Sequence, residues 1–349
     1  MDSHTATAGH SLADTPILIL SQDYELFFQE SGTIEKCLFE PCDALLKFAA
    51  VHRVKFTFFV DAGMLLAMQR YAKSRAKIAQ TLSKVQRHIE SLAAAGHEIA
   101  LHVHPHWEDT RWIDGRWVFA GTRYQLQEFD GDDVIRIFRQ YSESLAALSG
   151  QRPTSFRAGG FCVEPFSALA PALTEVGIAV DSSVVPGATL RDPDKGFDFA
   201  SAPRWDWWRF DTTPVLAKTD GGFLEIPITP MRLPVFYYWS RLVDRVAGNI
   251  VSQKFGDGTS KAIGRAEVLR RLAGMNRIAE LSIDDPKARH LLTDQNLQST
   301  RGIWHLMGHP KLLSSRALKI LEQFIGEMGI QRSETIAAVA SLILSYERT

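Results

Sequence analysis

Residues 96–107 read GHEIALHVHPHW and combine an apolar run with three histidines, His102, His104 and His106. The apolar run predicts a short buried strand that delivers the histidines to its carboxyl end. Open α/β sheets and α/β barrels carry their chemistry at that end of their strands, on loops held by a rigid scaffold. Because Pro105 does not fit an ordinary helix interior, we expect one tight loop turn to bring His102 and His106 together.

Two imidazoles at this spacing can share one divalent metal ion. An open metal site then needs a third protein ligand, here a carboxylate, and keeps one position for water. The competing interpretation is that the histidines lie on the surface, or lie in the core with their ring nitrogens hydrogen-bonded. For a single histidine, this is the more common case. A cluster of three favours a metal site that contains His102 and His106, and His104 between them is expected to be structural.

A pair of acidic residues follows another apolar run, ILIL at residues 17–20, which is typical of a fully buried parallel strand. Asp23 and Glu25 come soon after this run, and acidic residues seldom sit there without a partner. If the backbone stays extended, both side chains point to the same side, so that one can bind a metal ion while the other faces the water on that ion. The alternative is an ordinary solvated loop.

Strands and helices alternate along most of the chain, which favours parallel βαβ units in a doubly wound sheet or a barrel. Strands are predicted at residues 17–20, 55–60, 99–101, 155–160, 177–183, 223–228 and 302–307. Helices are predicted at residues 43–52, 76–95, 130–148, 163–176, 266–282, 315–328 and 334–346, the last with Ser333 as its N-cap. The alternation lapses at about 231–300, which indicates an insertion in a single domain that spans residues 15–349.

The composition limits the classes of protein to which the chain can belong. Its 349 residues fit one α/β barrel. A net charge of -1, with both signs interspersed, gives no reason to expect nucleic acid as a partner. Three cysteines without CxxC spacing argue against a disulfide framework and favour a reducing compartment.

Targeting signals are also missing from the sequence. Residues 1–14 are expected to be disordered and lack the basic start and apolar stretch of a signal peptide. No segment has the ~20 apolar residues of a membrane span. We therefore expect a cytoplasmic protein without membrane contact, and its oligomeric state stays open, with a homodimer as one option.

Two aromatic groups lie near the predicted site. One surrounds the Asp-Gly pair at residues 114–115, a two-residue hairpin signal, and its rings either stack on sugars or, as we favour, pack against one another. The other, at residues 205–208, either walls a pocket or plugs a barrel end. The predicted substrate-binding residues are Trp107, Gly159, Gly160 and Trp208.

The predicted strand ends carry side chains that can bind a metal ion, transfer protons or hold a carboxylate. An arginine at the end of a strand, Arg157, is suited to hold a carboxylate bidentately. In chain order the set is Asp23, Glu25, His102, His106, Arg157, Asp181 and His309.

This set resembles the polysaccharide deacetylases of the NodB homology group, carbohydrate esterase family 4. GHEIALHVHPH is similar to the GHEIGxHxxxH motif of that family, which is the most specific match, and KFTFFV at residues 55–60 resembles its xATFFV strand. FRAGG at 156–160 is similar to a degraded RxPxG motif, DSS at 181–183 to the motif that carries an aspartate, and the strand before His309 to the final histidine motif. The resemblance covers most of the chain outside the insertion and implies a distorted (β/α) barrel of about seven strands.

One motif departs from the family pattern. The usual first motif is TFDDG, in which the first aspartate is the base and the second binds the metal, whereas SQDYE places Tyr24 at the second position. A subset of the family reads Asp-x-Asp or Asp-x-Glu, which Asp23-Tyr24-Glu25 resembles. The resemblance implies that Asp23 is the general base and that Arg157 orients it. It implies that Glu25, His102 and His106 bind the metal ion. His309 would be the general acid, with a pKa adjusted by Asp181.

The resemblance implies a metal-dependent hydrolase that removes an acetyl group from an N- or O-acetylated carbohydrate. Zinc is the default ion for two imidazoles and a carboxylate, with cobalt, nickel or manganese also open. A cytoplasmic address favours a small, lipid-linked or nucleotide-linked sugar as substrate. Tyr24 keeps open a metal-independent hydrolase of a small non-sugar amide. A carbohydrate-binding pseudo-enzyme is the third option, against which the presence of Asp23, Arg157 and His309 speaks.

Overall fold

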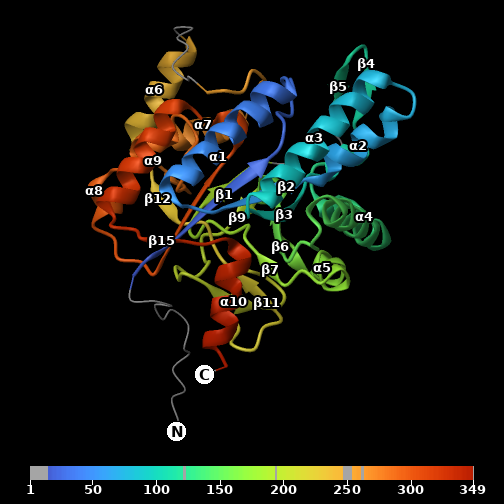
Figure 1. Ribbon diagram of the computed structural model, residues 1–349. Helices are drawn as coiled ribbons and strands as arrows, with labels where there is room; N and C mark the ends of the chain where they lie inside the picture. Colours follow the sequence, from blue (N-terminus) through green and yellow to red (C-terminus); the bar gives the residue numbers. More distant parts are fainter. Residues whose placement is uncertain (1–14, 121–122, 193–194, 247–253, 261–262, 349) are drawn as a thin grey trace.

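The computed structural model describes residues 15–120, 123–192, 195–246, 254–260 and 263–348. The strands of its main sheet are β1 (Ile17–Tyr24), β2 (Phe56–Asp61), β3 (Glu98–Val103), β6 (Ser155–Ala158), β7 (Val180–Asp181), β10 (Trp208–Phe210), β11 (Phe223–Glu225), β14 (Ile303–Gly308) and β15 (Arg332–Ser333). Seven of them run parallel in the order β11-β7-β6-β3-β2-β1-β14 (Figure 1). Antiparallel β10 extends the β11 edge, and β15 pairs with the start of β1.

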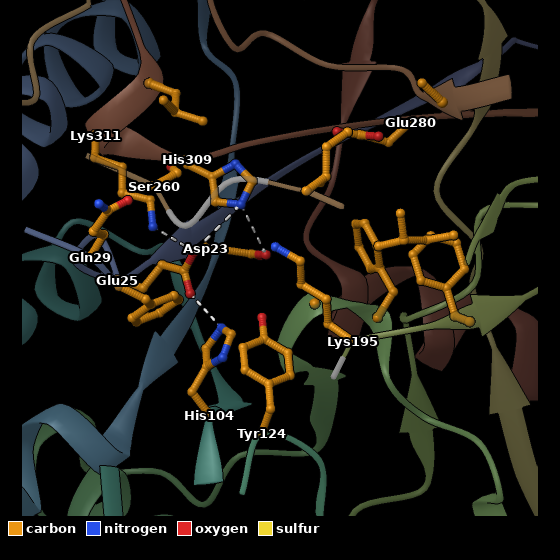
Figure 2. A pocket seen from close by; sticks show the side chains of 18 of the residues that line it. Asp23, Glu25, Gln29, His104, Tyr124, Lys195, Ser260, Glu280, His309 and Lys311 are labelled. Atoms are coloured by element: carbon orange, nitrogen blue, oxygen red, sulfur yellow. Dashed lines mark hydrogen bonds and ion pairs between the residues drawn. The ribbon is translucent and has the colours of Figure 1, made fainter. Parts of the chain in front are cut away.

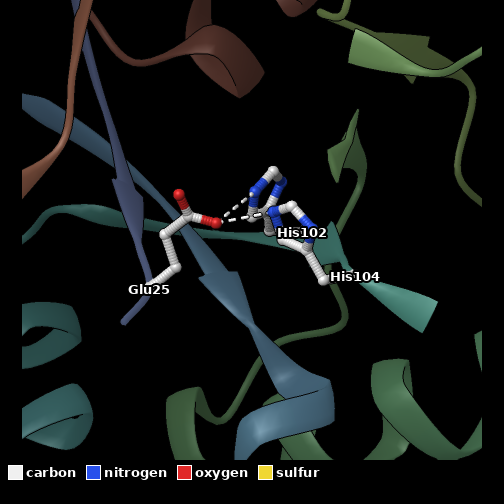
Figure 3. A group of neighbouring side chains, drawn as sticks. All are labelled: Glu25, His102 and His104. Atoms are coloured by element: carbon white, nitrogen blue, oxygen red, sulfur yellow. Dashed lines mark hydrogen bonds and ion pairs between the residues drawn. The ribbon is translucent and has the colours of Figure 1, made fainter. Parts of the chain in front are cut away.

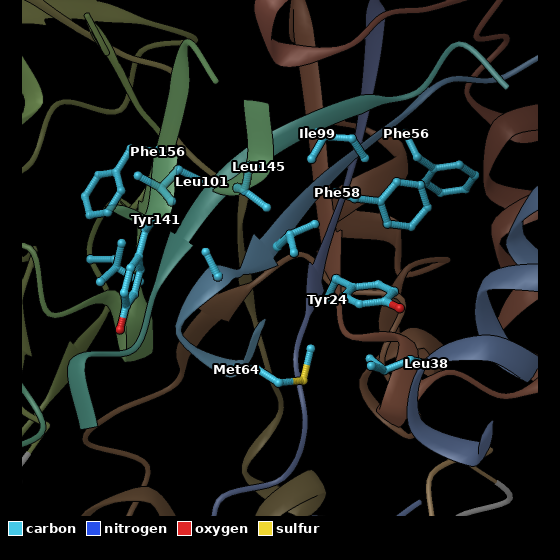
Figure 4. Close-up of a cluster of buried hydrophobic side chains, with 14 of the residues drawn as sticks. Tyr24, Leu38, Phe56, Phe58, Met64, Ile99, Leu101, Tyr141, Leu145 and Phe156 are labelled. Atoms are coloured by element: carbon cyan, nitrogen blue, oxygen red, sulfur yellow. The ribbon is translucent and has the colours of Figure 1, made fainter. Parts of the chain in front are cut away.

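Helices pack on the outer face of this sheet (Figure 1). They are α1 (Glu40–His52), α2 (Ala62–Ala72), α3 (Ala76–Ala94), α4 (Gly131–Ser149), α5 (Ala170–Val176) and α9 (Ser315–Glu327). Side chains alternate across each strand, so every second residue faces these helices. Phe58 of β2, Leu101 of β3 and Tyr141 of α4 are fully buried in the resulting core (Figure 4).

The opposite, inner face of the sheet is apolar at the beginning of the strands. Ile19 and Phe59 pack there against Val339 of α10 (Ile336–Tyr346). Thr57 and Glu98 accept hydrogen bonds from the first two N–H groups of this helix. Helix α10 therefore closes the amino-terminal end of the curled sheet.

The sheet curls far enough for its two ends to meet. After β11, the Thr229 N–H donates to the His305 carbonyl of β14 at 3.0 Å, and the Leu281 N–H donates to the Thr229 carbonyl at 2.7 Å. The Met307 N–H of β14 in turn donates to the Leu281 carbonyl at 3.0 Å. These bonds close the carboxyl end of the strands, and the structure confirms an α/β fold with a barrel-like sheet.

Residues 230–300 form the region in which the regular alternation stops. It contains β12 (Pro230–Arg232), α6 (Val235–Val246), α7 (Arg265–Leu272), β13 (Ile278–Glu280), a 3-10 turn (Lys287–His290) and α8 (Asp294–Leu297). The helix predicted at 266–282 is wrong after Leu272, because the chain turns at Gly274 with φ +74° and continues as β13, which pairs with β12.

Short elements complete the chain between these larger ones. They are the hairpin β4 (Arg111–Ile113) and β5 (Arg116–Val118), the pair β8 (Thr189–Leu190) and β9 (Phe197–Asp198), a π-helical turn (Glu35–Phe39), and 3-10 turns at Pro105–Glu108, Leu126–Glu128, Gly159–Phe161, Phe166–Ala168 and Pro310–Leu312. The hairpin turn at Asp114 and Gly115 is confirmed, with φ values of 48° and 81°.

Two smaller predictions differ from the structure. The helix predicted at 163–176 begins only at Ala170, because Pro171 lacks a backbone N–H and is accommodated in a first helical turn. The N-cap of α10 is Thr335, whose side chain accepts from the Ala338 N–H, and Ser333 lies in β15 instead. The disorder predicted for residues 1–14 lies outside the described residues. In the part of the chain that is described, no helix is both long and apolar enough to cross a membrane.

Candidate active site

Glu25, His102 and His104 form a buried group at the carboxyl end of the strands (Figure 3). Glu25 directly follows β1, His102 belongs to β3, and His104 follows β3. One donor atom of each side chain lies within 4.8 Å of the other two. The Glu25 Oε2 atom lies 2.6 Å from His104 Nε2 and 3.3 Å from His102 Nε2. Two imidazoles and one carboxylate in this arrangement suit a divalent transition metal.

The orientation of His102 supports this use. Its Nδ1 atom lies 2.9 Å from the Arg157 carbonyl oxygen, which can only accept, so Nδ1 carries the hydrogen and the lone pair of a neutral ring is on Nε2. Nε2 faces Glu25, and Asp23 Oδ2 lies 3.8 Å away. Burial lowers the pKa of His102, but the carboxylates of Asp23 and Glu25 outweigh it and raise the pKa to about 9. The same carboxylates would attract a metal cation, so these residues fit one.

His104 was predicted to be structural, yet its ring belongs to the group. The chain is still extended at His104, with φ -109° and ψ 97°, so His102 and His104 point to the same side as alternate residues of a strand do. Burial lowers the pKa of His104 to about 4, which keeps the ring neutral, as a metal ligand must be.

His106, which was predicted as a ligand, lies outside the group. It belongs to the 3-10 turn that begins at Pro105, where the alternation of the strand has ended. Its ring stacks on Tyr124 with centroids 5.9 Å apart and meets the edge of Phe28 at 4.5 Å. The His106 ring nitrogens are buried and have no hydrogen-bond partner among the described residues. The group that could hold a metal ion therefore contains His104, and His106, which was predicted as its ligand, does not contribute to it in this structure.

Gly159 lies directly against the His104 ring. A Cβ atom at Gly159 would come within 2.4 Å of His104 Nδ1, so a glycine is required for this close approach. The next residue, Gly160, has φ +60° and lies against the Tyr124 side chain. Gly159 thus positions a histidine of the group that could hold a metal ion. Gly160 lines the cavity described below.

Replacing Gly159 with alanine is expected to displace the His104 ring and to weaken metal binding by about tenfold, the lower range for loss of a residue that orients a ligand. Metal titration of the purified variant measures this. Gly131→Ala is a matched control, because no atom lies within 4 Å of the added Cβ. Equal metal affinity in the two variants would show that the Gly159 contact does not hold His104.

Asp23 and Arg157 form a buried ion pair beside this group. Arg157 Nη1 donates to Asp23 Oδ1 at 2.6 Å, and Nη2 donates to Ser21 Oγ at 2.9 Å. The Arg157 Nε–H donates to the Ser182 carbonyl at 2.8 Å, and the guanidinium lies over the Phe59 ring at 4.1 Å. One carboxylate oxygen of Asp23 is thereby fixed, and the other, Oδ2, faces the histidines.

His309 approaches the same two carboxylates from β14. Its Nε2 atom lies 3.8 Å from Asp23 Oδ2 and 3.6 Å from Glu25 Oε1. Its Nδ1 atom lies 2.8 Å from Asp284 Oδ2, and its backbone N–H donates to the other oxygen of Asp284 at 2.7 Å. Burial opposes protonation of the ring, but Asp284 outweighs it and the pKa of His309 is raised.

Asp181 was predicted to adjust the pKa of His309. In the structure, the carboxylate that contacts the His309 ring is that of Asp284. Asp181 instead accepts a hydrogen bond from Ser183 at 2.6 Å, next to Glu225 on the neighbouring strand. Burial, followed by the charge of Asp181, raises the pKa of Glu225 well above its usual range. The two acids are therefore a buried pair in which the protonated form of Glu225 is favoured, and the contact to His309 is made by Asp284 instead.

Lys311, two residues beyond His309, was missed in the sequence. Its buried ammonium donates to Glu25 Oε1 at 2.8 Å and to the Leu26 carbonyl at 2.7 Å. Burial raises the pKa of Glu25, but Lys311 and His104 outweigh it, so that carboxyl stays ionised. Lys311 holds one oxygen of Glu25 and leaves the other, Oε2, facing the two histidines.

A cavity of about 1340 Å³ opens above these groups. Asp23, His104 and His309 lie on its floor, and Tyr124 and Lys195 point toward them (Figure 2). The two tryptophans predicted to bind substrate do not line it. Trp107 donates from Nε1 to Asp61, and Trp208 donates to the Pro214 carbonyl at 2.8 Å, and both are buried. Their roles are in packing, because the 3-10 turn after β3 and the short β10 turn them away from the cavity.

No known family profile matches the chain, and no curated protein matches it by sequence. Solved structures do match. The structural neighbours over nearly the full chain are polysaccharide deacetylases and carbohydrate esterase family 4 proteins. A protein of Mycobacterium smegmatis assigned as a polysaccharide deacetylase is 17% identical, with a TM-score of 0.47 and coverage of 98% of this chain and 96% of that chain.

Two further neighbours differ in what they do. A family 4 carbohydrate esterase from Streptomyces lividans, solved in complex with acetate, is 10% identical, with a TM-score of 0.40 and coverage of 92% and 94%. A family 4 pseudoenzyme from Bacillus anthracis is also 10% identical, with a TM-score of 0.39 and coverage of 95% and 66%. At such identities, the chemistry of this chain has to be read from its own site.

Proposed function

We propose that the chain is a metal-dependent hydrolase that removes an acetyl group from an N- or O-acetylated carbohydrate. One observation carries the proposal. A metal-ligand group, an aspartate fixed by an arginine, and a histidine fixed by an aspartate converge on the floor of one cavity. These are the three parts that metal-assisted hydrolysis of an acyl bond requires.

Glu25, His102 and His104 would hold the ion, and two imidazoles with one carboxylate favour zinc. When bound, a divalent ion lowers the pKa of a water molecule and polarises the carbonyl oxygen of the acyl group. Asp23 Oδ2 accepts the proton of the attacking water. Arg157 keeps the other oxygen of Asp23 occupied, so the carboxylate presents Oδ2 in one orientation.

His309 supplies the proton that the leaving amine or alcohol needs. Its Nε2 atom is at the cavity floor and 3.8 Å from Asp23 Oδ2, so the base and the acid flank one position. Asp284 fixes the ring through Nδ1 and favours its charged form. The raised pKa favours the protonated ring, from which His309 can donate.

The pH profile of the Asp284→Asn variant tests the role of His309. A general acid must be protonated, so kcat/KM falls as the pH rises through its pKa. Loss of the Asp284 charge lowers the pKa of His309, and we expect the falling limb of the profile to move down by roughly one pH unit. An unmoved limb would show that His309 is not the titrating acid.

Metal content and acetate release test the proposed function directly. We expect the purified, untagged protein to contain a divalent ion by plasma emission, and to release acetate from at least one member of a panel of acetylated sugars. A chelator should stop the release and added ion should restore it. Bound ion without acetate release from any acetylated sugar would contradict the proposal.

The Lys311 contact favours one alternative, a metal-independent hydrolase of a small amide. The Lys311 ammonium already supplies a cation to Glu25. In that case, the protein would contain no metal, and acyl release would persist in the presence of a chelator. The same two measurements therefore decide between the candidates.

A further inference from the structure

The Tyr124 hydroxyl points into the cavity above the candidate active site, toward its floor (Figure 2). In the part of the chain that the structure describes, this hydroxyl has no hydrogen-bond partner. By contrast, the hydroxyl of the fully buried Tyr141 donates to Glu108 at 3.0 Å. A tyrosine hydroxyl in a protein interior usually finds a partner. The Tyr124 hydroxyl can therefore bond to a group that enters the cavity.

Ring contacts on two sides fix the Tyr124 side chain. The ring stacks on that of His106, with centroids 5.9 Å apart and an angle of 12° between the planes. It also meets the His104 ring, at 5.9 Å and 71°. The backbone is held as well, since the Tyr124 N–H donates to Glu128 Oε2 at 2.6 Å. A donor that is fixed in this way needs no reorganisation when negative charge develops in front of it.

A glycine pair brings the Tyr124 hydroxyl close to the end of β6. A Cβ atom at Gly160 would come within 2.8 Å of Tyr124 Oη, just as one at Gly159 would come within 2.4 Å of His104 Nδ1. The two glycines therefore admit both side chains. The phenol thus lies beside the buried group to which His104 belongs.

Hydrolysis of an acyl bond places negative charge on the acyl oxygen. Attack by water forms a new C–O bond at the acyl carbon, and the electron pair of the C=O π bond moves to the oxygen. In the proposed function, Asp23 and His309 are used for proton transfer. The buried cations Arg157 and Lys311 already donate to carboxylates. A further hydrogen-bond donor near the floor would stabilise the charged oxygen.

Two side chains that line the cavity, Tyr124 and Lys195, point toward the floor (Figure 2). The Lys195 ammonium is carried on a flexible chain, whereas the ring contacts of Tyr124 hold its hydroxyl in one place. A phenol keeps its proton at neutral pH and can donate it in a hydrogen bond. These properties favour Tyr124 as the donor to the acyl oxygen.

We propose that Tyr124 is a further catalytic residue, whose O–H donates a hydrogen bond to the acyl oxygen while that oxygen carries negative charge. The proton stays on Tyr124. When the electron pair returns to re-form the C=O bond, the bond to the leaving nitrogen or oxygen breaks, and its electron pair takes the proton that His309 donates. This role in acyl hydrolysis rests on the proposed function, whereas the ability of the hydroxyl to bind an oxyanion does not depend on it.

Tyr124→Phe tests the role in catalysis, because it removes only the hydroxyl and keeps the ring. With an acetylated sugar from which the wild type releases acetate, we expect kcat to fall by about a hundred-fold, as when one donor to such an oxygen is lost. KM should change by about twofold or less. Tyr71→Phe is the matched control, since Tyr71 is partly buried in α2 and does not line the cavity. Plasma emission should find the wild-type metal content in both variants.

A Tyr124→Phe variant with the kcat of the wild type would overturn the proposal. An effect on KM alone would overturn it too, because the hydroxyl would then bind the substrate equally well before and during the reaction.

Binding of methylphosphonate tests the hydrogen bond in the absence of turnover. This ion carries a methyl group and charged oxygens on a tetrahedral phosphorus, as the intermediate of acetyl hydrolysis does on carbon. Calorimetric titration of the zinc-loaded proteins should give an affinity about tenfold weaker for Tyr124→Phe than for wild type or Tyr71→Phe. No binding by the wild type, or equal binding by all three proteins, would overturn the proposal.

The two measurements also separate this proposal from the proposed function. A wild type that binds methylphosphonate more tightly than Tyr124→Phe, but releases acetate from no acetylated sugar, would contradict the proposed function and support the oxyanion contact of Tyr124.

Discussion

Asp23→Asn is expected to lower kcat by about a thousand-fold, within the range that a positioned general base contributes. The amide oxygen can still accept from Arg157, but the amide nitrogen at the position of Oδ2 cannot take a proton from water. Metal content should stay at the wild-type level, because Asp23 lies outside the metal-ligand group. Acetate release and plasma emission on the same preparation measure both quantities.

Ser21→Ala provides the control for this variant. Ser21 also contacts Arg157, at 2.9 Å, but it does not line the cavity. The Ser21→Ala variant should therefore retain most of the wild-type activity. Near-normal turnover in Asp23→Asn would show that another group is the base, and thermal melting of both variants separates loss of chemistry from loss of fold.

The second large effect is on metal affinity, and it distinguishes His104 from His106. His104→Ala should weaken metal affinity by more than the roughly 10–100-fold loss that follows when a residue that only orients a ligand is changed. His106→Ala should keep the metal, because its ring packs between Phe28 and Tyr124 and lies outside the ligand group. Metal titration of the two variants, side by side, gives the comparison.

The opposite pattern would support the ligand set that the family resemblance implies. Metal retained in His104→Ala and lost in His106→Ala would mean that the turn after β3 rearranges when the ion binds. His102→Ala should lose the metal under either ligand set, and it therefore serves as the positive control for both.

Much of the fold follows from local patterns in the sequence. The apolar runs at residues 17–20 and 302–307 predict buried strands, and β1 and β14 are such strands. Chemistry at strand ends was predictable for the same reason, since parallel strands bring their carboxyl ends to one edge. Asp23 and Glu25 do lie on one side, because β1 stays extended through Tyr24.

The presence of His104 in the group with Glu25 and His102, and the absence of His106 from it, depend on where β3 ends. Proline at position 105 indicated a turn, but the turn begins after His104, so the alternation of β3 still governs that residue. The rule of alternate residues could have predicted the pair His102 and His104. A motif with a spacing of four residues favoured His106 instead.

Asp284 and Lys311 could not have been assigned from local sequence. Asp284 lies in the region where the alternation lapses, and only the hydrogen bonds that close the sheet through Leu281 bring it to His309. Lys311 lies in a turn after β14, and its burial depends on Phe27 and Phe28 from the other end of the chain. Such long-range contacts leave no periodic signal.

The position of β1 between β2 and β14 sets an order for biosynthesis. Glu25, His102 and His104 are translated within the first third of the chain and need only β1, β2 and β3 to meet. His309 and Lys311 reach them only when β14 adds to the other edge of β1. A ribosome-bound chain can thus bring Glu25, His102 and His104 together before His309 and Lys311 are in place. We therefore expect the proposed hydrolase activity to begin only once β14 has left the ribosome and has paired with β1.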